Sequence, residues 1–540
     1  MAENLKFNSS APAIRLPAFN RFGLVRTLDW TLAGTLALLV ILGFGLRVTQ
    51  LGAIGFAEDE MNKLEAIHAY ERGDFSANSE HPMVMKLLMW ASVNKAQASS
   101  LEAALRMPNA LIGALTVIPI FLLTLALFDR WTALLAAAFW AFGINAITHN
   151  RIGKEDSLLV FFMLFAFFFF VSAKQLSPVD KPGRARRYAA SAVSFGLMIA
   201  SKYFPHYLGL NLLFHHNFHL REAHPNEPSG TIPGWFFIVI VGVFLFANPA
   251  VLMPEVWKYM NAYTSERLLT HSGYLFADKL YKNNMSSSPF WGTPVYFYLL
   301  FLAIKVPIVT LIAFLGGLFV AIRRPRHVGH AFLLFMFLFW IVPYSLIGGK
   351  WLRYTLSMMP FVYMLAAVGV VGLVRWSTAR FANSRRASFA VSATAVVLFV
   401  CFPAWTAFAN CPHYALYTNA FAAGKAGYFF PHDEFYDDGL REALKFVSEQ
   451  APVGATIAHE TPGVARHYLS VFGRTDLNSQ VISSPQFDVR SASGPVYVIA
   501  QRGRTYFENR DELEVVRSKF RKVHTVTIEG VTAAEVFVNQ

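Results

Sequence analysis

Long apolar segments recur along this chain from near its beginning to about residue 407. Hydrophobic residues make up 55% of the 540 residues and charged residues only 15%, whereas a soluble domain has about 25% charged residues. A bilayer span needs about 17–25 mostly apolar residues. The sequence therefore predicts a polytopic α-helical membrane protein, and it excludes a single soluble enzyme, a disordered chain, a collagen and a coiled coil. We predict eleven spans, near residues 30–47, 106–128, 131–148, 157–173, 188–202, 204–219, 232–253, 294–322, 328–347, 355–374 and 388–407.

The least regular predicted pair, 188–219, is interrupted by Lys202 and Pro205. Two short helices with a re-entrant tip would fit that stretch equally well. The eleven spans and the short segments between them form the predicted membrane module, residues 30–407.

Basic residues are distributed unevenly between the predicted loops. The net charge is +13, yet 13 basic and 15 acidic residues lie from Ala407 onward, so the positive excess belongs to the first 406 residues. Such an excess beside apolar spans indicates topology, and we do not interpret it as nucleic-acid binding. The positive-inside rule places the basic N-terminus, residues 1–29, on the cytoplasmic side of the membrane. We expect that membrane to be the plasma (inner) membrane. The predicted outer loops are 48–105, 149–156, 254–293 and 348–354, and the C-terminal residues 408–540 also lie outside.

The C-terminal residues 408–540 have the pattern of an extracytoplasmic α/β domain. Asp437-Asp438 precede a helical stripe that begins at Leu440, with acid at its N-terminus. Strand-like runs follow at 456–458, 496–500, 523–528 and 535–538. Two cysteines, Cys401 and Cys411, exclude a disulfide framework and a cysteine-based metal site. The N-terminus shows no cleavable signal peptide.

The first outer loop carries three adjacent carboxylates, Glu58-Asp59-Glu60, followed later by Glu80-His81-Pro82. Adjacent carboxylates raise one another's pKa. Such a group of acids is retained where it binds a cation or takes up a substrate proton. Pro82 suits the first turn of a short interfacial helix, whose N-terminus would favour a phosphate near His81. A solvated acidic loop with an ordinary capping turn is the alternative interpretation.

Further ionisable residues lie at the outer ends of other spans. Charges at a bilayer boundary are candidates for function, although Arg and Lys also snorkel there as simple anchors. Acid on one loop and cations on several others is the arrangement expected for displacing a phosphate leaving group. These candidates are Arg151, Lys154, Glu155 and Asp156 in the second outer loop, Lys202 at a span end, Arg267 and His271 in the predicted outer loop 254–293, and Lys350, Arg353 and Tyr354 before a late span.

Four of these segments resemble the C-type integral-membrane glycosyltransferases, and within them the relatives of protein O-mannosyltransferases and lipid A aminoarabinose transferases. The segments are Asp59-Glu60 with His81-Pro82, Arg151-Ile152 with Asp156-Ser157-Leu158, Ser201-Lys202-Tyr203, and Lys350 with Arg353-Tyr354 and Pro360. The stretch Asp433–Gly439 is similar to the head of the extracytoplasmic domain in bacterial members. Met83 replaces the last residue of the first-loop motif, and Glu155 replaces an apolar residue before Asp156.

The resemblance implies a polyprenyl-phosphate-linked sugar as donor, an inverting transfer to an acceptor hydroxyl, and a site on the outer face. It implies Asp59 as general base, which needs only hydrogen-bond reach to the hydroxyl. Glu60 and Asp156 would bind acceptor or metal or orient Asp59, and Arg151 would pair with Asp59 or Asp156. The implied phosphate ligands are His81, Lys202 and Arg353, with Lys350 interchangeable with Arg353, and with His271 and Arg267 as weaker candidates; Glu80 and Tyr354 would orient them.

No cofactor is required by this interpretation, while a divalent cation at Asp59 and Asp156 stays open. The expected partners are the lipid-linked donor, membrane lipid and an acceptor protein, lipid or glycan, with no nucleic acid. A transporter or lipid flippase is the alternative function. It would place charges near the bilayer midplane and usually repeat its halves, whereas only Lys305 interrupts a span interior and no repeat is visible. A non-enzymatic scaffold gives no reason for Asp59, Asp156 and Lys202.

Overall fold

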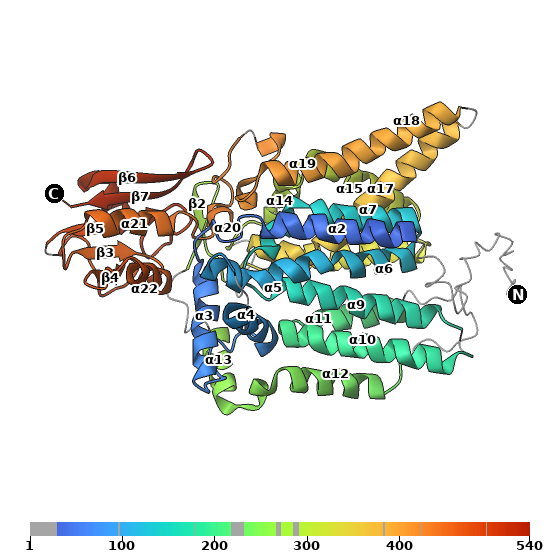
Figure 1. The fold of residues 1–540 in the computed structure, drawn as a ribbon, viewed down its shortest axis with the longest axis horizontal. Coiled ribbons are helices and arrows are strands. Elements are labelled where there is room, and N and C mark those ends of the chain that lie inside the picture. The colour runs from blue at the N-terminus through green and yellow to red at the C-terminus, as the bar shows by residue number, and fades with distance from the viewer. Residues whose placement is uncertain are drawn as a thin grey trace, which may run out of the picture.

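A bundle of helices forms most of the molecule and carries a small sheet at one end (Figure 1). The computed structural model describes residues 30–539 except 96–97, 178, 218–231, 266–271, 285–290, 382–383, 423 and 493. The bundle helices are α2 (Trp30–Val48), α5 (Leu101–Leu115), α6 (Val117–Leu127), α7 (Arg130–Phe142), α8 (Ile144–Asn150), α9 (Asp156–Gln175), α10 (Lys181–Ser201), α11 (His206–Asn217), α12 (Trp235–Ala247), α14 (Phe297–Lys305), α15 (Ile308–Arg323), α16 (Val328–Leu346), α17 (Met359–Arg380), α18 (Arg385–Val396) and α19 (Phe402–Ala409).

Each predicted span coincides with one of these helices or with a consecutive pair. By length and composition, six helices of the described chain can cross a membrane, or seven if the bent pair α7–α8 forms one span. The predicted number of eleven is therefore not confirmed, because several helices are short or carry charge. The predicted break near Lys202 and Pro205 is present, since α10 ends at Ser201 and α11 begins at His206.

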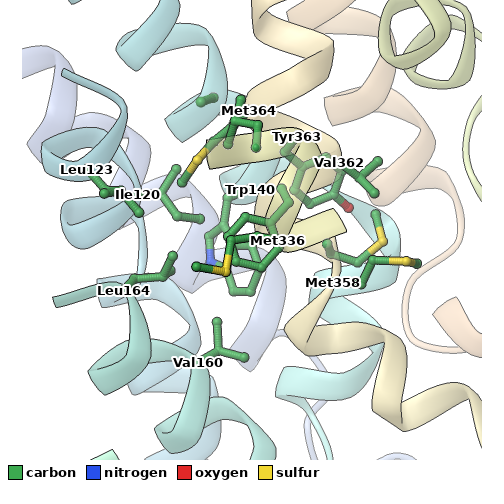
Figure 2. Packing of buried hydrophobic residues seen from close by; sticks show 14 of the residues in the cluster. Ile120, Leu123, Trp140, Val160, Leu164, Met336, Met358, Val362, Tyr363 and Met364 are labelled. Carbon is green, nitrogen blue, oxygen red and sulfur yellow. The ribbon is translucent and has the colours of Figure 1, made fainter. Parts of the chain in front are cut away.

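Large apolar side chains from most of the bundle helices fill its centre, and Figure 2 shows part of this cluster. Trp140 of α7 is fully buried and donates its indole N–H to the carbonyl of Gly113 at 2.7 Å. Around it lie Ile120 and Leu123 of α6, Val160 and Leu164 of α9, Met336 of α16, and Val362, Tyr363 and Met364 of α17. An indole N–H that finds a backbone partner can be buried without a desolvation penalty.

Helices α15 and α17 approach each other so closely that only glycine fits at two facing positions. A Cβ on Gly317 would overlap the backbone of Leu365, and a Cβ on Gly369 would overlap the backbone of Ala313. Small residues at such crossings let membrane helices pack backbone to backbone. This contact joins α17, and therefore the segment before it, to the rest of the bundle.

Replacing Gly317 by Ala should destabilise this crossing by about 1–3 kcal/mol, because overpacking forces the helices apart. The matched control is Gly316→Ala, since a Cβ there would meet its nearest neighbour, Gly369 Cα, only at 4.0 Å. Thermal unfolding in detergent compares the two variants with the wild type. Equal melting temperatures for both variants would contradict this account of the packing.

Three helices and two strands lie between the bundle and the C-terminal sheet. They are α3 (Glu58–Glu71), α4 (Met83–Lys95), α13 (Pro254–Thr264), β1 (Tyr274–Phe276) and β2 (Lys279–Tyr281). Helices α3 and α13 run across the end of the bundle rather than along it (Figure 1). The short segments η1 (Pro249–Leu252), η2 (Leu352–Ser357), η3 (Val397–Cys401), η4 (Tyr414–Leu416) and η5 (Ala420–Ala422) connect the elements. The carboxylates of the first loop thus begin a helix that lies at the end of the bundle.

The C-terminal part contains a five-stranded sheet in the order β4-β3-β5-β7-β6. Strand β3 is parallel to β4 and β5, and β7 is antiparallel to β5 and β6. The elements are α20 (Pro431–Phe435), α21 (Leu440–Gln450), β3 (Thr456–His459), α22 (Pro462–Val471), β4 (Asn478–Val481), β5 (Val496–Gln501), α23 (Arg510–Lys519), β6 (Arg521–Ile528) and β7 (Val531–Val538). The four strand-like runs expected from the sequence coincide with β3, β5, β6 and β7, while β4 was not expected.

Candidate active site

Asp59 lies in the first turn of α3 and is surrounded by groups from three other parts of the chain. Its Oδ1 lies 2.9 Å from Lys154 Nζ, and its Oδ2 accepts hydrogen bonds from Arg353 Nη1 and the Tyr436 hydroxyl, each at 2.5 Å. The Asp59 side chain is still 29% exposed. A substrate can therefore reach this carboxylate although every neighbour holds it in place.

Two carboxylates fix the start of α3: that of Glu60 on the same helix, and that of Asp437 in the C-terminal part of the chain. The Glu60 carboxylate accepts from Arg106 at 2.6 and 2.7 Å, from the Gly153 N–H at 2.8 Å and from the Ala57 N–H at 3.1 Å. The N-cap residue of α3 is Ala57, which has no side-chain cap to offer. These contacts bury the Glu60 carboxylate and occupy both of its oxygens. Glu60 therefore binds other partners than Asp59 does.

The missing helix cap is supplied by the C-terminal domain. The Asp437 carboxylate accepts the Glu58 N–H at 2.9 Å, and Arg504 binds both Asp437 and the Glu58 carboxylate, the latter at 2.7 Å. A carboxylate at the N-terminus of a helix accepts a hydrogen bond from a free backbone N–H and interacts favourably with the helix dipole. The direction of α3, and therefore the position of Asp59, depends on residues about 380 positions later in the sequence.

Three consecutive residues of the second loop reach three different partners. Lys154 binds Asp59, Glu155 Oε1 lies 2.8 Å from Lys63 Nζ, and Asp156 Oδ1 accepts from Lys202 Nζ at 2.6 Å. All three side chains are buried. Buried charges need such partners, because an unpaired ion inside a protein is strongly disfavoured.

These ion pairs set the protonation states around the site. Burial alone would raise the pKa of Asp59, but Lys154 and Arg353, helped by the Tyr436 hydroxyl, hold that pKa well below its usual value. Burial would likewise lower the pKa of Lys154, yet Asp59 raises it above its usual value. Asp59 is therefore ionised, and because it faces two cations this corner of the site carries an excess of positive charge.

His81 lies beside Glu155, with Nε2 at 3.7 Å from Oε2, just before α4. Burial and the nearby Lys63 and Lys154 hold the pKa of His81 well below its usual value, so the imidazole is neutral. Glu80 accepts a hydrogen bond from the Asn78 side chain, close to the same cluster. The structure thus places His81, a predicted phosphate ligand, and Glu80, predicted to orient such ligands, beside the charged cluster, and their roles stay predictions.

Aromatic rings lie beside the cationic groups of Lys202 and Arg353. Lys202 Nζ lies 5.1 Å from the centre of the Tyr354 ring and 4.7 Å from that of Phe204. The Arg353 guanidinium lies 5.6 and 5.7 Å from the rings of Trp351 and Tyr354. Tyr354 therefore separates the Asp59–Arg353 pair from the Asp156–Lys202 pair and contacts both cations.

Arg151 lies elsewhere than the sequence predicted. We expected it to pair with Asp59 or Asp156, but its guanidinium donates to carbonyls at the end of α2, those of Arg47 and Thr49 at 2.8 Å and that of Gln50 at 3.0 Å. The last carbonyls of a helix lack intrahelical partners and attract a cation. Arg151 therefore fastens the second loop to α2.

Lys350 and Arg353 are not interchangeable. Lys350 is fully buried and donates to the carbonyls of Thr293 at 2.7 Å and Ile347 at 2.5 Å, whereas Arg353 reaches Asp59. The two other predicted phosphate ligands, Arg267 and His271, fall outside the described residues. Of the predicted cations, Arg353 and Lys202 are the two that the structure brings to the carboxylates.

The sequence interpretation missed Tyr436 as a site residue, and it named Lys154 among the candidates without giving it a role. Snorkelling explained Lys154 well as a simple anchor, although its place directly before two acids, Glu155 and Asp156, was a signal for pairing. Tyr436 falls inside Asp433–Gly439, a segment already singled out, but nothing in its spacing indicates that it reaches the first loop. Lys63, on α3 one turn after Asp59, was not singled out either.

The arrangement does not suit the divalent cation left open at Asp59 and Asp156. Both oxygens of Asp59 already bind an ammonium or a guanidinium, and Asp156 binds Lys202. In the described part of the chain, no group of three or more His, Cys, Asp or Glu side chains is placed to hold a metal ion.

Replacing Arg106 by Met should destabilise the protein by about 3–5 kcal/mol, because Glu60 would be left charged and buried without its partner. The control is Arg375→Met, which breaks the exposed pair with Asp129, 3.0 Å apart and worth about 0–1 kcal/mol. Thermal unfolding of the purified variants measures both. A loss no larger than that of the control would argue against a structural role for Glu60.

Comparison with known proteins gives matches in sequence and in fold. A family model described as dolichyl-phosphate-mannose-protein mannosyltransferase matches residues 80–251. That range includes His81, Asp156 and Lys202. No curated protein matches the sequence significantly.

Solved structures match over almost the whole chain at low identity. The Archaeoglobus fulgidus oligosaccharyltransferase tethered with an acceptor peptide is 12% identical, with 94% of this chain and 74% of that chain covered and a TM-score of 0.50. The same archaeal enzyme, AglB, in complex with an inhibitory peptide and a dolichol-phosphate is 11% identical, with 95% and 74% covered and a TM-score of 0.50. ArnT from Cupriavidus metallidurans bound to undecaprenyl phosphate is 14% identical, with 96% and 99% covered and a TM-score of 0.48.

The predicted resemblance to the C-type integral-membrane glycosyltransferases is therefore confirmed. The archaeal structures share the fold, and the family model matches the stretch that holds the second loop and the Lys202 segment. Residues 80–251 are thus similar to mannosyltransferases and the fold is similar to that of an oligosaccharyltransferase, while six or seven helices of the described chain are long and apolar enough to cross a membrane.

Proposed function

We propose that this glycosyltransferase moves a sugar from a polyprenyl-phosphate donor to an acceptor hydroxyl on the non-cytoplasmic side of the membrane, with inversion at the anomeric carbon. One observation carries the proposal: the partly exposed Asp59 carboxylate faces two cations, Lys154 and Arg353, at the end of the bundle. A base beside surplus positive charge is what a hydroxyl nucleophile and a phosphate leaving group require.

The donor phosphate would bind at Arg353 and Lys202. Arg353 is 20% exposed and shares Asp59 with Lys154, so it can turn to a phosphate without leaving Asp59 unpaired. Lys202 lies on the other side of Tyr354, just after α10, and pairs with Asp156 at 2.6 Å. The dolichol-phosphate named in one archaeal complex supports a donor of this chemistry.

Asp59 would act as the general base. The acceptor O–H bond breaks and its proton passes to Asp59, while the oxygen forms a bond to the anomeric carbon. The bond between that carbon and the phosphate oxygen breaks on the opposite face, and its electron pair leaves with the polyprenyl phosphate. Arg353 and Lys202 stabilise the negative charge that develops on the leaving group.

Donor binding would also activate this base. Lys154 and Arg353 hold the pKa of Asp59 well below its usual value and so make it a weak base. A phosphate that draws Arg353 away removes one of these two cations from the carboxylate. Asp59 then becomes more basic when the donor is in place, which couples proton abstraction to donor binding.

The proposed side of the membrane rests on charge. Asp59, α3 and the C-terminal sheet lie at one end of the bundle, whereas the Lys181 end of α10 and the Arg380 end of α17 lie at the other (Figure 1). The positive-inside rule assigns the basic end of the bundle to the cytoplasmic side of the plasma (inner) membrane. The site and residues 408–540 are then extracytoplasmic.

The sequence feature that favoured a transporter has another explanation in the fold. Lys305, the charge inside a predicted span, ends α14 and lies 2.8 Å from Glu434 of the C-terminal segment. Its Nζ also donates to the Ala415 carbonyl at 2.7 Å. This cation therefore joins the bundle to the C-terminal part and does not line a path through the membrane.

Asp59→Asn should lower turnover about 10²–10⁴-fold, the usual contribution of a general base. Release of undecaprenyl phosphate from a panel of undecaprenyl-phosphate hexoses and pentoses is measured in proteoliposomes supplied with acceptor membranes. The control is Glu65→Gln, an exposed carboxylate on the same helix. Wild-type turnover in the Asp59→Asn variant would sink the assignment of the base.

Arg353→Met should weaken binding of undecaprenyl phosphate about tenfold to hundredfold, because a charge-assisted hydrogen bond to phosphate is lost. Titration of the protein's tryptophan fluorescence with the lipid measures the affinity. Arg380→Met, at the opposite end of α17, removes the same charge and should leave the affinity unchanged. Equal affinities in all three proteins would remove Arg353 from the phosphate site.

A further inference from the structure

The loop between α20 and α21 brings a tyrosine of the C-terminal domain to the first-loop carboxylate. The Tyr436 hydroxyl donates to Asp59 Oδ2 at 2.5 Å, and Arg353 Nη1 lies 3.4 Å from the same hydroxyl. Tyr436 and Asp59 are 377 positions apart in sequence. The sequence interpretation gave Tyr436 no role and did not connect its segment with the first loop.

The backbone of this loop is held in a conformation that side-chain-bearing residues rarely adopt. Tyr436 has φ of 47° and Asp437 has φ of 67°, both in the left-handed region. Left-handed non-glycine residues persist where the surroundings over-determine them, and they cluster at functional sites. Two in succession indicate that the direction of the Tyr436 side chain is constrained.

The constraint comes from the end of strand β5. Asp437 accepts hydrogen bonds from the side chains of Gln501, at 3.2 Å, and Arg504, at 2.6 Å to Nε, and it caps α3 through the Glu58 N–H. The C-terminal end of the central strand β5 thus fixes Asp437, and its neighbour Tyr436 is aimed at Asp59. One short loop holds both the helix that carries the base and the base itself.

We propose that Tyr436 is a positioning residue for Asp59, and that the C-terminal α/β domain thereby forms one wall of the active site. The inference rests on the proposed function of Asp59 as general base. Among the described residues Lys154 binds Oδ1, while Tyr436 and Arg353 share Oδ2. When the donor phosphate engages Arg353, Tyr436 is the remaining group that holds Oδ2, so it keeps the carboxylate aimed at the acceptor hydroxyl.

The charged and titratable groups around Asp59 come from every element packed against it. The direct neighbours are Lys154, Arg353 and Tyr436. The next groups are Glu58 and Glu60 on its own helix, His81 before α4, Glu155 and Asp156 in the second loop, and Lys202 after α10. Tyr436→Phe changes none of these charges, because the tyrosine is neutral, so a changed pH profile reports the lost hydrogen bond.

The test compares Tyr436→Phe with Tyr497→Phe in the proteoliposome assay. Tyr497 lies on β5 of the same domain, and its exposed hydroxyl makes one hydrogen bond, to the Gln450 carbonyl at 3.3 Å. We measure kcat, the KM for the lipid donor, the pH dependence of kcat, and the melting temperature. Tyr436→Phe should lower kcat about tenfold to hundredfold with the donor KM unchanged, because a misplaced base loses effective molarity.

The acid limb of the kcat profile should move to higher pH in Tyr436→Phe. The hydroxyl hydrogen bond favours the charged carboxylate, so its loss raises the pKa at which Asp59 takes up a proton. Tyr497→Phe should match the wild type in all four measurements. A wild-type kcat and profile in Tyr436→Phe, or a fall in kcat that only follows a fall in melting temperature, would overturn the positioning role.

The Asp59→Asn variant is assayed in parallel to separate the two proposals. If Asp59→Asn is inactive and Tyr436→Phe behaves as the wild type, the positioning role fails while the proposed function stands. If Asp59→Asn keeps wild-type turnover, or if the wild type itself transfers no sugar, the proposed function fails and the positioning role fails with it.

Discussion

The ion cluster around one carboxylate organises the functional end of this protein. Asp59 is held by Lys154 from the second loop, Arg353 from the segment before α17, and Tyr436 from the C-terminal part. None of these groups is close to another in sequence, so the cluster forms only when the bundle and the sheet have come together. Its buried charges are tolerated because each has an opposite charge within ion-pair distance.

Alternating charge lets one short loop serve several partners at once. Lys154, Glu155 and Asp156 follow one another, and they bind Asp59, Lys63 and Lys202 respectively. Glu155 departs from the family pattern of an apolar residue, and Lys63 supplies the cation that makes its burial possible. The departure is therefore compensated within the same cluster.

The sequence was sufficient to predict the helical bundle and the convergence of Asp59, Arg353, Asp156 and Lys202 at one end of it. It was not sufficient to separate Arg353 from Lys350, because both follow a span and only the turn of η2 decides which of them reaches a carboxylate. Arg151 was assigned a carboxylate partner, since sequence cannot show that backbone carbonyls at the end of α2 are closer. Strand β4 was missed because Asn478–Val481 is a short, mostly exposed edge strand without an apolar alternation.

The cap that Asp437 places on α3 has a consequence for how the protein is synthesised. A ribosome delivers Ala57 and Glu58 early and Asp437 only after all of the membrane helices, so the first loop waits through most of synthesis without its final partner. Until then Asp59 stands on a first turn that lacks its Asp437 cap, and the orientation of α3 is completed only when the C-terminal sheet has formed and docked.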